Sequence, residues 1–295
     1  MSGLRSAIDA LDTESYSSTT TSGPTLVAPS SQQREVASDD RPPISMIGRV
    51  DALLEVLKGQ ERPMSISDLA LCTGIPKATV SRIAAELVDR GLLERQAAGL
   101  RLGLRLFELG EHASRPTSLR RLALVRMARL RKVTQQTVNL AVLERDEIVH
   151  IAILRSPATP PLPTRVGGRL PAYATGLGKA LLSYLPDRRV CELVPDPVVG
   201  VGPRTVGDRA SLLDQLAMVR TAGVAYEREE FAADVACVAA LVPGADGRPI
   251  AALSVSAHAH LANLQQLGVE VRAVADLLAR DASKHRLVAA DERRR

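Results

Sequence analysis

The sequence has few cysteines and no long apolar segment, and each absence excludes a class of protein. Its three cysteines, Cys72, Cys191 and Cys237, show no CxxC spacing, so neither a disulfide framework nor a zinc finger is indicated, and we expect no metal or cofactor. No apolar run approaches the roughly 18 residues of a membrane helix. The N-terminus also lacks a compact apolar signal segment, and we expect a cytoplasmic protein that does not enter the membrane.

Large apolar side chains are also scarce at the start of the chain. Residues 1–43 are rich in Ser, Thr, Pro, Asp and Gln, a composition typical of disorder. Residues 288–295 form a second, charged tail. The 295-residue chain exceeds the usual size of one domain, so we expect two domains between the tails.

Charge is distributed unevenly along the chain. Residues 41–132 carry 17 Lys and Arg against nine Asp and Glu, whereas residues 133–279 carry 13 against 15. An acid-free basic run contributes Arg120, Arg121, Arg126, Arg129, Arg131 and Lys132. Such asymmetry is typical of a surface that binds a polyanion, although a solvated helix face explains the basic run equally well.

Residues 65–90 have the pattern of two short helices joined by a turn. Ser67 is expected to cap the first helix, and Gly74 to end it in a left-handed conformation. Pro76 fits the first turn of the second helix. Four side chains at helical spacing in that helix are expected to pack inward: Val80, Ile83, Ala84 and Leu87. This pattern indicates a helix-turn-helix.

The outer face of the second helix suits the major groove of DNA. Arg and Lys reach guanine O6 and N7, and hydroxyls contact phosphates or base edges. The expected DNA-contacting residues of the two helices are Ser67, Lys77, Ala78, Thr79, Ser81 and Arg82. An ordinary helical hairpin with a solvated charged face is the alternative interpretation.

The flanking segments favour DNA binding. Upstream, apolar residues between 46 and 57 form a helical stripe. Downstream, residues 91–95 and 100–102 flank a short loop, as in a two-stranded wing. Arg95 and Arg101 stand at the base of this wing and are expected to touch the DNA backbone. The predicted winged helix-turn-helix domain spans residues 44–103.

Residues 104–116 are expected to form a linker helix that is broken before Pro116, with Ser118 capping the next helix. Beyond it, strand and helix patterns mix. The expected strands are 137–143, 148–154, 235–242 and 249–256, and the expected helices are 180–185, 212–221 and 263–285. Residues 117–287 are therefore predicted to form an α+β domain around an antiparallel sheet.

Several motifs in this order resemble the isocitrate lyase regulator (IclR) family of bacterial transcription factors. They are GIPKATVSRI (74–83), RLGLRLFELG (101–110), TVNLAVLERDEIVHI (137–151), VGGRLPAYATGLGKALL (166–182) and EREEFAADVACVAALVPGADGRPIAALSVS (227–256). The resemblance implies a winged helix, a linker helix used in dimerisation, and a GAF-like domain that binds a small effector. The implied partners are double-stranded operator DNA, the effector, and further copies of the chain in a homodimer or tetramer.

The effector site is suggested by a strand and a glycine-rich turn. Alternation in residues 252–260 places Ser254 and Ser256 on one strand face, where a ligand, the local backbone or water would satisfy their hydroxyls. Glycines in residues 174–179 let backbone amides approach an anionic ligand, and a purely structural turn is as consistent with them. From the resemblance, the expected effector-binding residues are Gly176, Leu177, Glu227, Cys237, Ser254 and Ser256.

The expected effector is a small organic acid or aromatic metabolite, because small apolar groups are mixed with hydroxyls. Two residues depart from the common family pattern: Tyr173 replaces a frequent histidine, which changes the rim of the pocket, and Leu100 replaces a wing aromatic.

The sequence also allows two other functions. A cysteine-dependent hydrolase would use Cys237 as nucleophile, His258 or His260 as base and Glu227 as the orienting acid. We expect no enzyme, because a lone cysteine in an apolar strand is more often part of the core. A ligand-independent DNA-binding protein would leave the acidic C-terminal domain unexplained.

Overall fold

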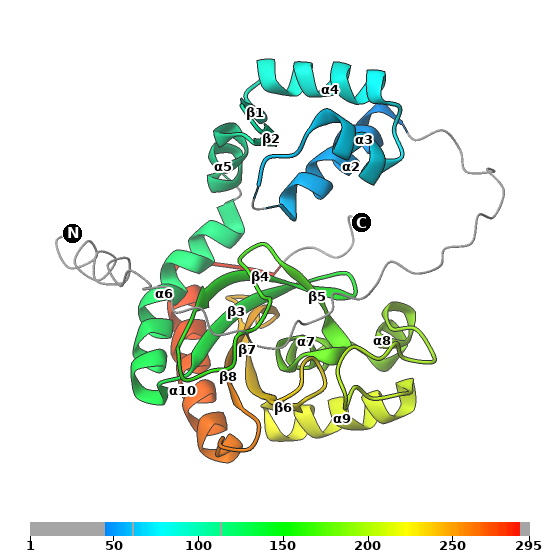
Figure 1. The fold of residues 1–295 in the computed structure, drawn as a ribbon. Coiled ribbons are helices and arrows are strands. Elements are labelled where there is room, and N and C mark those ends of the chain that lie inside the picture. The colour runs from blue at the N-terminus through cyan, green and yellow to red at the C-terminus, as the bar shows by residue number, and fades with distance from the viewer. Residues whose placement is uncertain (1–44, 61, 113, 290–295) are drawn as a thin grey trace.

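The computed structural model describes residues 45–60, 62–112 and 114–289. The predicted N-terminal tail and residues 290–295 of the predicted C-terminal tail lie outside the described residues. Figure 1 shows a small N-terminal unit and a larger C-terminal unit joined through two consecutive helices. No helix of the described residues is long and apolar enough to cross a membrane.

The N-terminal unit is the predicted winged helix-turn-helix. It consists of α2 (Met46–Lys58), α3 (Ile66–Thr73), α4 (Lys77–Asp89), β1 (Leu93–Gln96) and β2 (Gly99–Leu102). Its core contains the four α4 residues expected to face inward, together with Leu53, Leu57, Leu69, Ile75, Leu93 and Leu100. The buried stripe of α4 leaves the opposite face of that helix exposed.

The predicted N-cap at Ser67 is wrong, because the hydroxyl of Ser65 caps α3 instead. Ser65 Oγ accepts a hydrogen bond from the amide of Asp68 at 3.2 Å and donates to the Asp68 carboxylate at 2.7 Å. Ser67 lies inside the helix and is exposed. The end of the helix was predicted correctly, since Gly74 has a φ of +67°.

Two helices follow the wing: α5 (Leu104–Glu111) and the 21-residue α6 (Ser114–Thr134). The linker helix ends before Pro116, as predicted, but the predicted cap at Ser118 is wrong. Pro116 lies in the first turn of α6, where a missing backbone N–H breaks no helical hydrogen bond. The helix therefore begins earlier than the proline suggests.

The C-terminal unit is built on a six-stranded antiparallel sheet with the strand order β5-β4-β3-β8-β7-β6. The strands are β3 (Thr137–Glu144), β4 (Glu147–Leu154), β5 (Arg169–Pro171), β6 (Ala225–Arg228), β7 (Val235–Pro243) and β8 (Pro249–His258). The two predicted strand pairs are present as hairpins. The edge strands β5 and β6 were not predicted.

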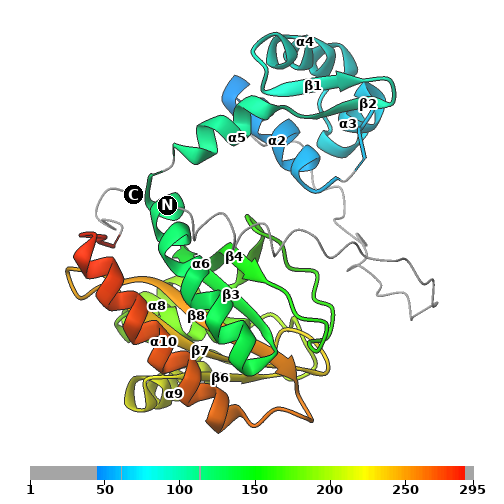
Figure 2. The same cartoon turned by 90° about the vertical axis from the view of Figure 1, so that its left-hand side faces the viewer.

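Helices cover both faces of this sheet (Figure 1). On one face, α6 and α10 (Leu264–Lys284) lie side by side, as Figure 2 shows. On the other face lie η1 (Ala172–Ala174), α7 (Gly176–Leu182), α8 (Asp187–Leu193) and α9 (Arg209–Ala222). The predicted closing helix and α9 are present, whereas α7 begins at Gly176 rather than at Ala180, and α8 was not predicted.

Candidate functional site

The outer face of α4 carries the side chains predicted to contact DNA. Lys77, Ala78, Ser81 and Arg82 are exposed, and Thr79 is half-buried. Neither Lys77 nor Arg82 forms an ion pair with any residue that the structure describes. Most of these residues lie in the first half of α4, the part of a recognition helix that contacts base edges.

The two arginines of the wing lie in different surroundings. Arg95 lies opposite Leu100, next to the tip of the hairpin rather than at its base as predicted. Arg101 lies opposite Glu94 and forms an ion pair with it at 2.7 Å. The hydrogen bonds and charge of Arg101 hold the pKa of Glu94 below its ordinary value. Leu100, the residue expected to replace a wing aromatic, packs into the core and is 1% exposed.

The basic run on α6 contains one residue that joins α6 to α10 and four residues that are exposed. Arg126 forms an ion pair with Asp281 of α10 at 2.9 Å and so holds the two helices together. The exposed basic residues of the run are Arg120, Arg121, Arg129 and Lys132.

The six predicted effector-binding residues line one cavity between the sheet and α7. Its volume is about 30 Å³, enough for one or two water molecules. The residues that complete its wall are Asn139, Ile148, His150, Leu162, Thr164, Leu170, Thr175, Phe231 and Val235. The cavity thus receives side chains from both hairpins of the sheet.

Asn139, a residue that was not predicted, is the hydrogen-bonding partner of the two serines. Its side-chain amide donates to Ser254 Oγ at 3.4 Å and to Ser256 Oγ at 3.2 Å. Ser256 Oγ in turn donates to Cys237 Sγ at 3.7 Å. These contacts form a polar patch on the cavity wall.

Burial shifts the pKa of three titratable groups in the cavity. Burial lowers the pKa of His150 to about 4 and raises the pKa of Cys237 to about 12, so both side chains are neutral at pH 7. Burial also raises the pKa of Glu227 to about 7, although Glu227 accepts hydrogen bonds from the amides of Glu230 and Phe231. His150 Nδ1 has no hydrogen-bonding partner among the described residues.

The glycine-rich turn brings the backbone close to the cavity without directing its lysine there. A Cβ atom on Gly176 would lie 3.2 Å from Cys237 Sγ, so glycine permits the close approach of α7 to β7. The amide of Gly178 donates to the capping hydroxyl of Thr175. Lys179 is 1% exposed and forms a buried ion pair with Glu230.

Tyr173 was expected to change the rim of the pocket, and this prediction is wrong. Its hydroxyl donates to the carbonyl of Val199 at 3.0 Å, and its ring packs in the core beneath the helices of that face. The ring does not belong to the cavity wall.

The catalytic triad of the hydrolase alternative is not assembled. The imidazoles of His258 and His260 contact Asp234 at 2.9 and 2.8 Å. Cys237 contacts a serine hydroxyl, and its pKa of about 12 keeps the thiol protonated. The hypothesis therefore lacks a base beside its nucleophile.

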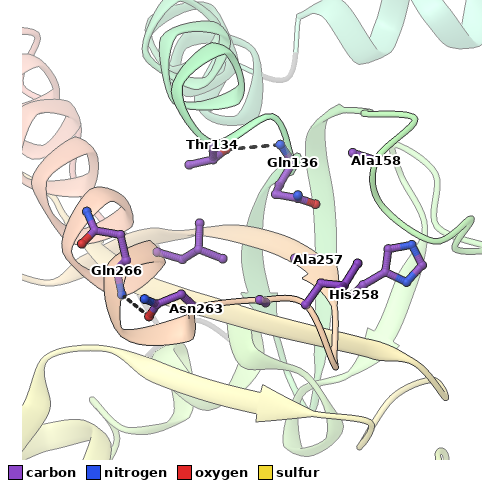
Figure 3. Close-up of a pocket in the computed structure, with 10 residues that line it drawn as sticks. Thr134, Gln136, Ala158, Ala257, His258, Asn263 and Gln266 are labelled. Atoms are coloured by element: carbon purple, nitrogen blue, oxygen red, sulfur yellow. Dashed lines mark hydrogen bonds between the residues drawn. The ribbon is translucent and has the colours of Figure 1, made fainter.

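A second, more open cleft of about 210 Å³ lies between the end of α6, the end of β8 and the start of α10. Figure 3 shows Asn263 and Gln266 on one side of it and the ring of His258 on the other. Its amides maintain local structure, since Asn263 Oδ1 caps α10 and Gln136 Oε1 accepts from Thr159. None of the predicted effector-binding residues lines this cleft.

Comparison with known proteins matches both halves of the chain to one family. Residues 47–97 match the IclR helix-turn-helix domain, and residues 112–283 match the C-terminal domain of the bacterial transcriptional regulator IclR. The regulator KdgR of Dickeya chrysanthemi is 31% identical over 226 residues, covering 75% of this chain and 74% of KdgR. The regulator XynR of Escherichia coli K12 is 30% identical over 241 residues, covering 77% of this chain and 96% of XynR.

Solved structures show the same fold. An IclR homologue from Microbacterium hydrocarbonoxydans, crystallised with 4-hydroxybenzoate, superposes with a TM-score of 0.77 at 30% identity, covering 81% of this chain and all of that one. IclR of Thermotoga maritima superposes with a TM-score of 0.65 at 21% identity, covering 80% of this chain and 98% of that chain. Because two IclR domain families match it, and because a known regulator is 31% identical to it over 226 residues, this chain belongs to the IclR family of bacterial transcriptional regulators.

Proposed function

We propose that this protein binds its operator as a dimer or tetramer, and that a small aromatic or organic acid in the cavity beside α7 controls that binding. One observation carries the proposal: side chains from the β3–β4 and β7–β8 hairpins, β6 and α7 converge on a single buried, partly polar cavity. Because operator DNA lies in the bacterial cytoplasm, the proposal places the protein there.

The composition of the cavity favours an aromatic ring with polar substituents. Ile148, Leu162 and Leu177 supply apolar wall, and the patch around Asn139 supplies donors and acceptors. Among the residues that the structure describes, no Lys or Arg side chain lines the cavity, so recognition depends on hydrogen bonds rather than on a strong cation. The Microbacterium homologue was crystallised with a ligand of this class.

The present cavity must open for such a ligand to enter. Its volume of about 30 Å³ is far below the roughly 300 Å³ at which small-molecule pockets begin. Binding therefore favours a more open arrangement of the cavity wall. An effector changes DNA affinity only if it binds the DNA-competent and incompetent arrangements with different affinities.

Replacement of Ser254 and Ser256 by alanine in the full-length chain tests the site. Removal of two hydroxyls should weaken effector binding roughly ten- to a hundred-fold, while operator binding without effector persists. Calorimetry with a set of hydroxybenzoates and small organic acids measures the first effect, and fluorescence anisotropy of operator DNA measures the second.

The matched control is Ser183→Ala, since Ser183 is a buried serine of the same domain whose hydroxyl donates to the carbonyl of Ala180. It should leave the effector dissociation constant unchanged. An unchanged constant in the Ser254 and Ser256 double variant would place the ligand elsewhere. Failure of the whole set to bind a protein that still binds DNA would refute the ligand class.

A further inference from the structure

Two histidines and one aspartate meet where β8 ends and β7 begins. His258 Nδ1 lies 2.9 Å from one oxygen of the Asp234 carboxylate, and His260 Nδ1 lies 2.8 Å from the other. One potential ligand atom from each residue lies within 4.8 Å of the others. The cluster is separate from the effector cavity, whose wall includes none of the three.

Backbone structure fixes these side chains in place. His258 pairs with Val235 in the sheet, and the amide of Ala259 donates to the carbonyl of Asp234 at 3.0 Å. Asp234 has a φ of +60°, a left-handed conformation that aspartate adopts more readily than most residues. Its amide donates to the Glu229 carboxylate at 3.1 Å. The three side chains therefore extend from backbone that is held by hydrogen bonds.

Two imidazole nitrogens and a carboxylate oxygen form a ligand set suited to first-row divalent transition metals. Tetrahedral Zn²⁺ with bonds of about 2.0–2.1 Å separates its ligand atoms by about 3.3 Å. The observed nitrogen–oxygen distances of 2.9 and 2.8 Å lie within about 0.5 Å of that spacing. The partial exposure of all three groups leaves room for water to complete the coordination.

We propose that Asp234, His258 and His260 form a binding site for a divalent first-row transition metal ion, with Zn²⁺ as the reference ion. The guanidinium of Arg228 opposes binding, because it donates to the carbonyl of Ala259, between the two histidines. We therefore expect a moderate affinity, in the micromolar range.

The site is tested on untagged, full-length protein after chelator treatment. Titration with Zn²⁺ followed by metal analysis should give one ion per chain, and Zn²⁺ should raise the unfolding temperature. His258→Ala, His260→Ala and Asp234→Asn should each weaken binding by at least about tenfold, the loss seen when even a supporting group of a metal site is removed. Circular dichroism of each variant verifies that it folds.

The matched control is His285→Ala, which removes an exposed histidine outside the cluster and should not change the affinity. Co²⁺ distinguishes this site from one at Cys72, which is also exposed, because a thiolate ligand adds an intense charge-transfer absorption that nitrogen and oxygen ligands lack. Absence of binding at 100 μM Zn²⁺, binding insensitive to all three cluster substitutions, or a thiolate band would each overturn the proposal.

Discussion

Glu94 and Arg101 form an ion pair directly across the wing hairpin, and Glu94 also binds the first residue of the following helix. One Glu94 oxygen accepts from Arg101 Nε at 2.9 Å and from an Nη at 2.7 Å. The other oxygen accepts from the amide of Leu104 at 3.3 Å. A single carboxylate therefore connects the wing to α5 and occupies an arginine that was predicted to contact DNA.

Glu94→Gln should release Arg101 to bind a phosphate. Affinity for non-specific DNA should then increase, and the slope of log K against log salt should steepen by about one unit per added phosphate contact. Fluorescence anisotropy over a salt series measures this slope. The control is Glu86→Gln, which removes the partner of Arg90 on α4. Equal slopes for wild type and the Glu94 variant would show that Arg101 stays away from DNA.

Arg82→Ala should weaken specific operator binding by about 1 to 3 kcal/mol if this side chain contacts a base edge. Arg82 is exposed on α4, so the folded structure should be unaffected. The control is Arg90→Ala, because Arg90 follows the last turn of the same helix. Gel-shift titrations of both variants measure the effect, and equal affinities for the two would remove Arg82 from the base-reading set.

The binding of an anionic effector should weaken as the pH rises from 6 to 8. Glu227, with a pKa of about 7, is mostly neutral at pH 6 and mostly ionised at pH 8, where it repels a ligand carboxylate. The loss should approach at most about tenfold per pH unit, as for one proton taken up on binding. Glu227→Gln should make the affinity independent of pH in calorimetry. A variant with the wild-type pH profile would show that another group titrates.

The same carboxyl should affect stability in the absence of ligand. Because the folded state raises the pKa of Glu227 from 4.5 to about 7, the folded chain binds more protons than the unfolded chain between these values. Its contribution to the free energy of unfolding is complete below pH 4.5 and is lost by pH 7, a change of about 3 kcal/mol. Glu227→Gln should therefore be more stable than wild type at pH 8 in urea unfolding. A variant less stable than wild type at that pH would contradict this assignment.

Substitutions on α5 should disrupt the oligomer. Leu104, Phe107 and Leu109 are 64%, 63% and 54% exposed in one chain, an apolar surface that a second copy would cover. Phe107→Glu should shift the protein toward monomers at micromolar concentration in light scattering. The control, Leu261→Glu, alters a residue of the C-terminal unit that is 74% exposed. A wild-type protein that is already monomeric would contradict the proposed assembly.

The sequence was enough to predict a helix or strand where its apolar pattern repeats over many residues. Thirteen residues of α4 and the paired strands β3–β4 and β7–β8 repeat their apolar pattern often enough to identify each element. The strands β5 and β6 contain three and four residues, too few for a period to emerge. Their positions depend on neighbouring strands rather than on local pattern.

The cavity could be predicted only in part. The alternation of β8 correctly separated Ser254 and Ser256 from Leu253 and Val255, which pack against the helices of the opposite face. Asn139 and His150 were missed, although each is a polar residue inside an apolar strand. That signal was available, since a buried polar side chain needs a partner. The partners themselves come from distant segments and required the structure.

The division of β8 between two faces also bears on how this domain can change over evolutionary time. Residues at positions 254 and 256 contribute to the cavity, whereas residues at positions 253 and 255 hold α6 and α10. In the proposed effector site, substitutions at the first pair should alter ligand preference without disturbing the packing of the helices, because neighbouring strand residues point to opposite faces. The scaffold can therefore acquire a new chemical specificity one side chain at a time while its helical framework is preserved.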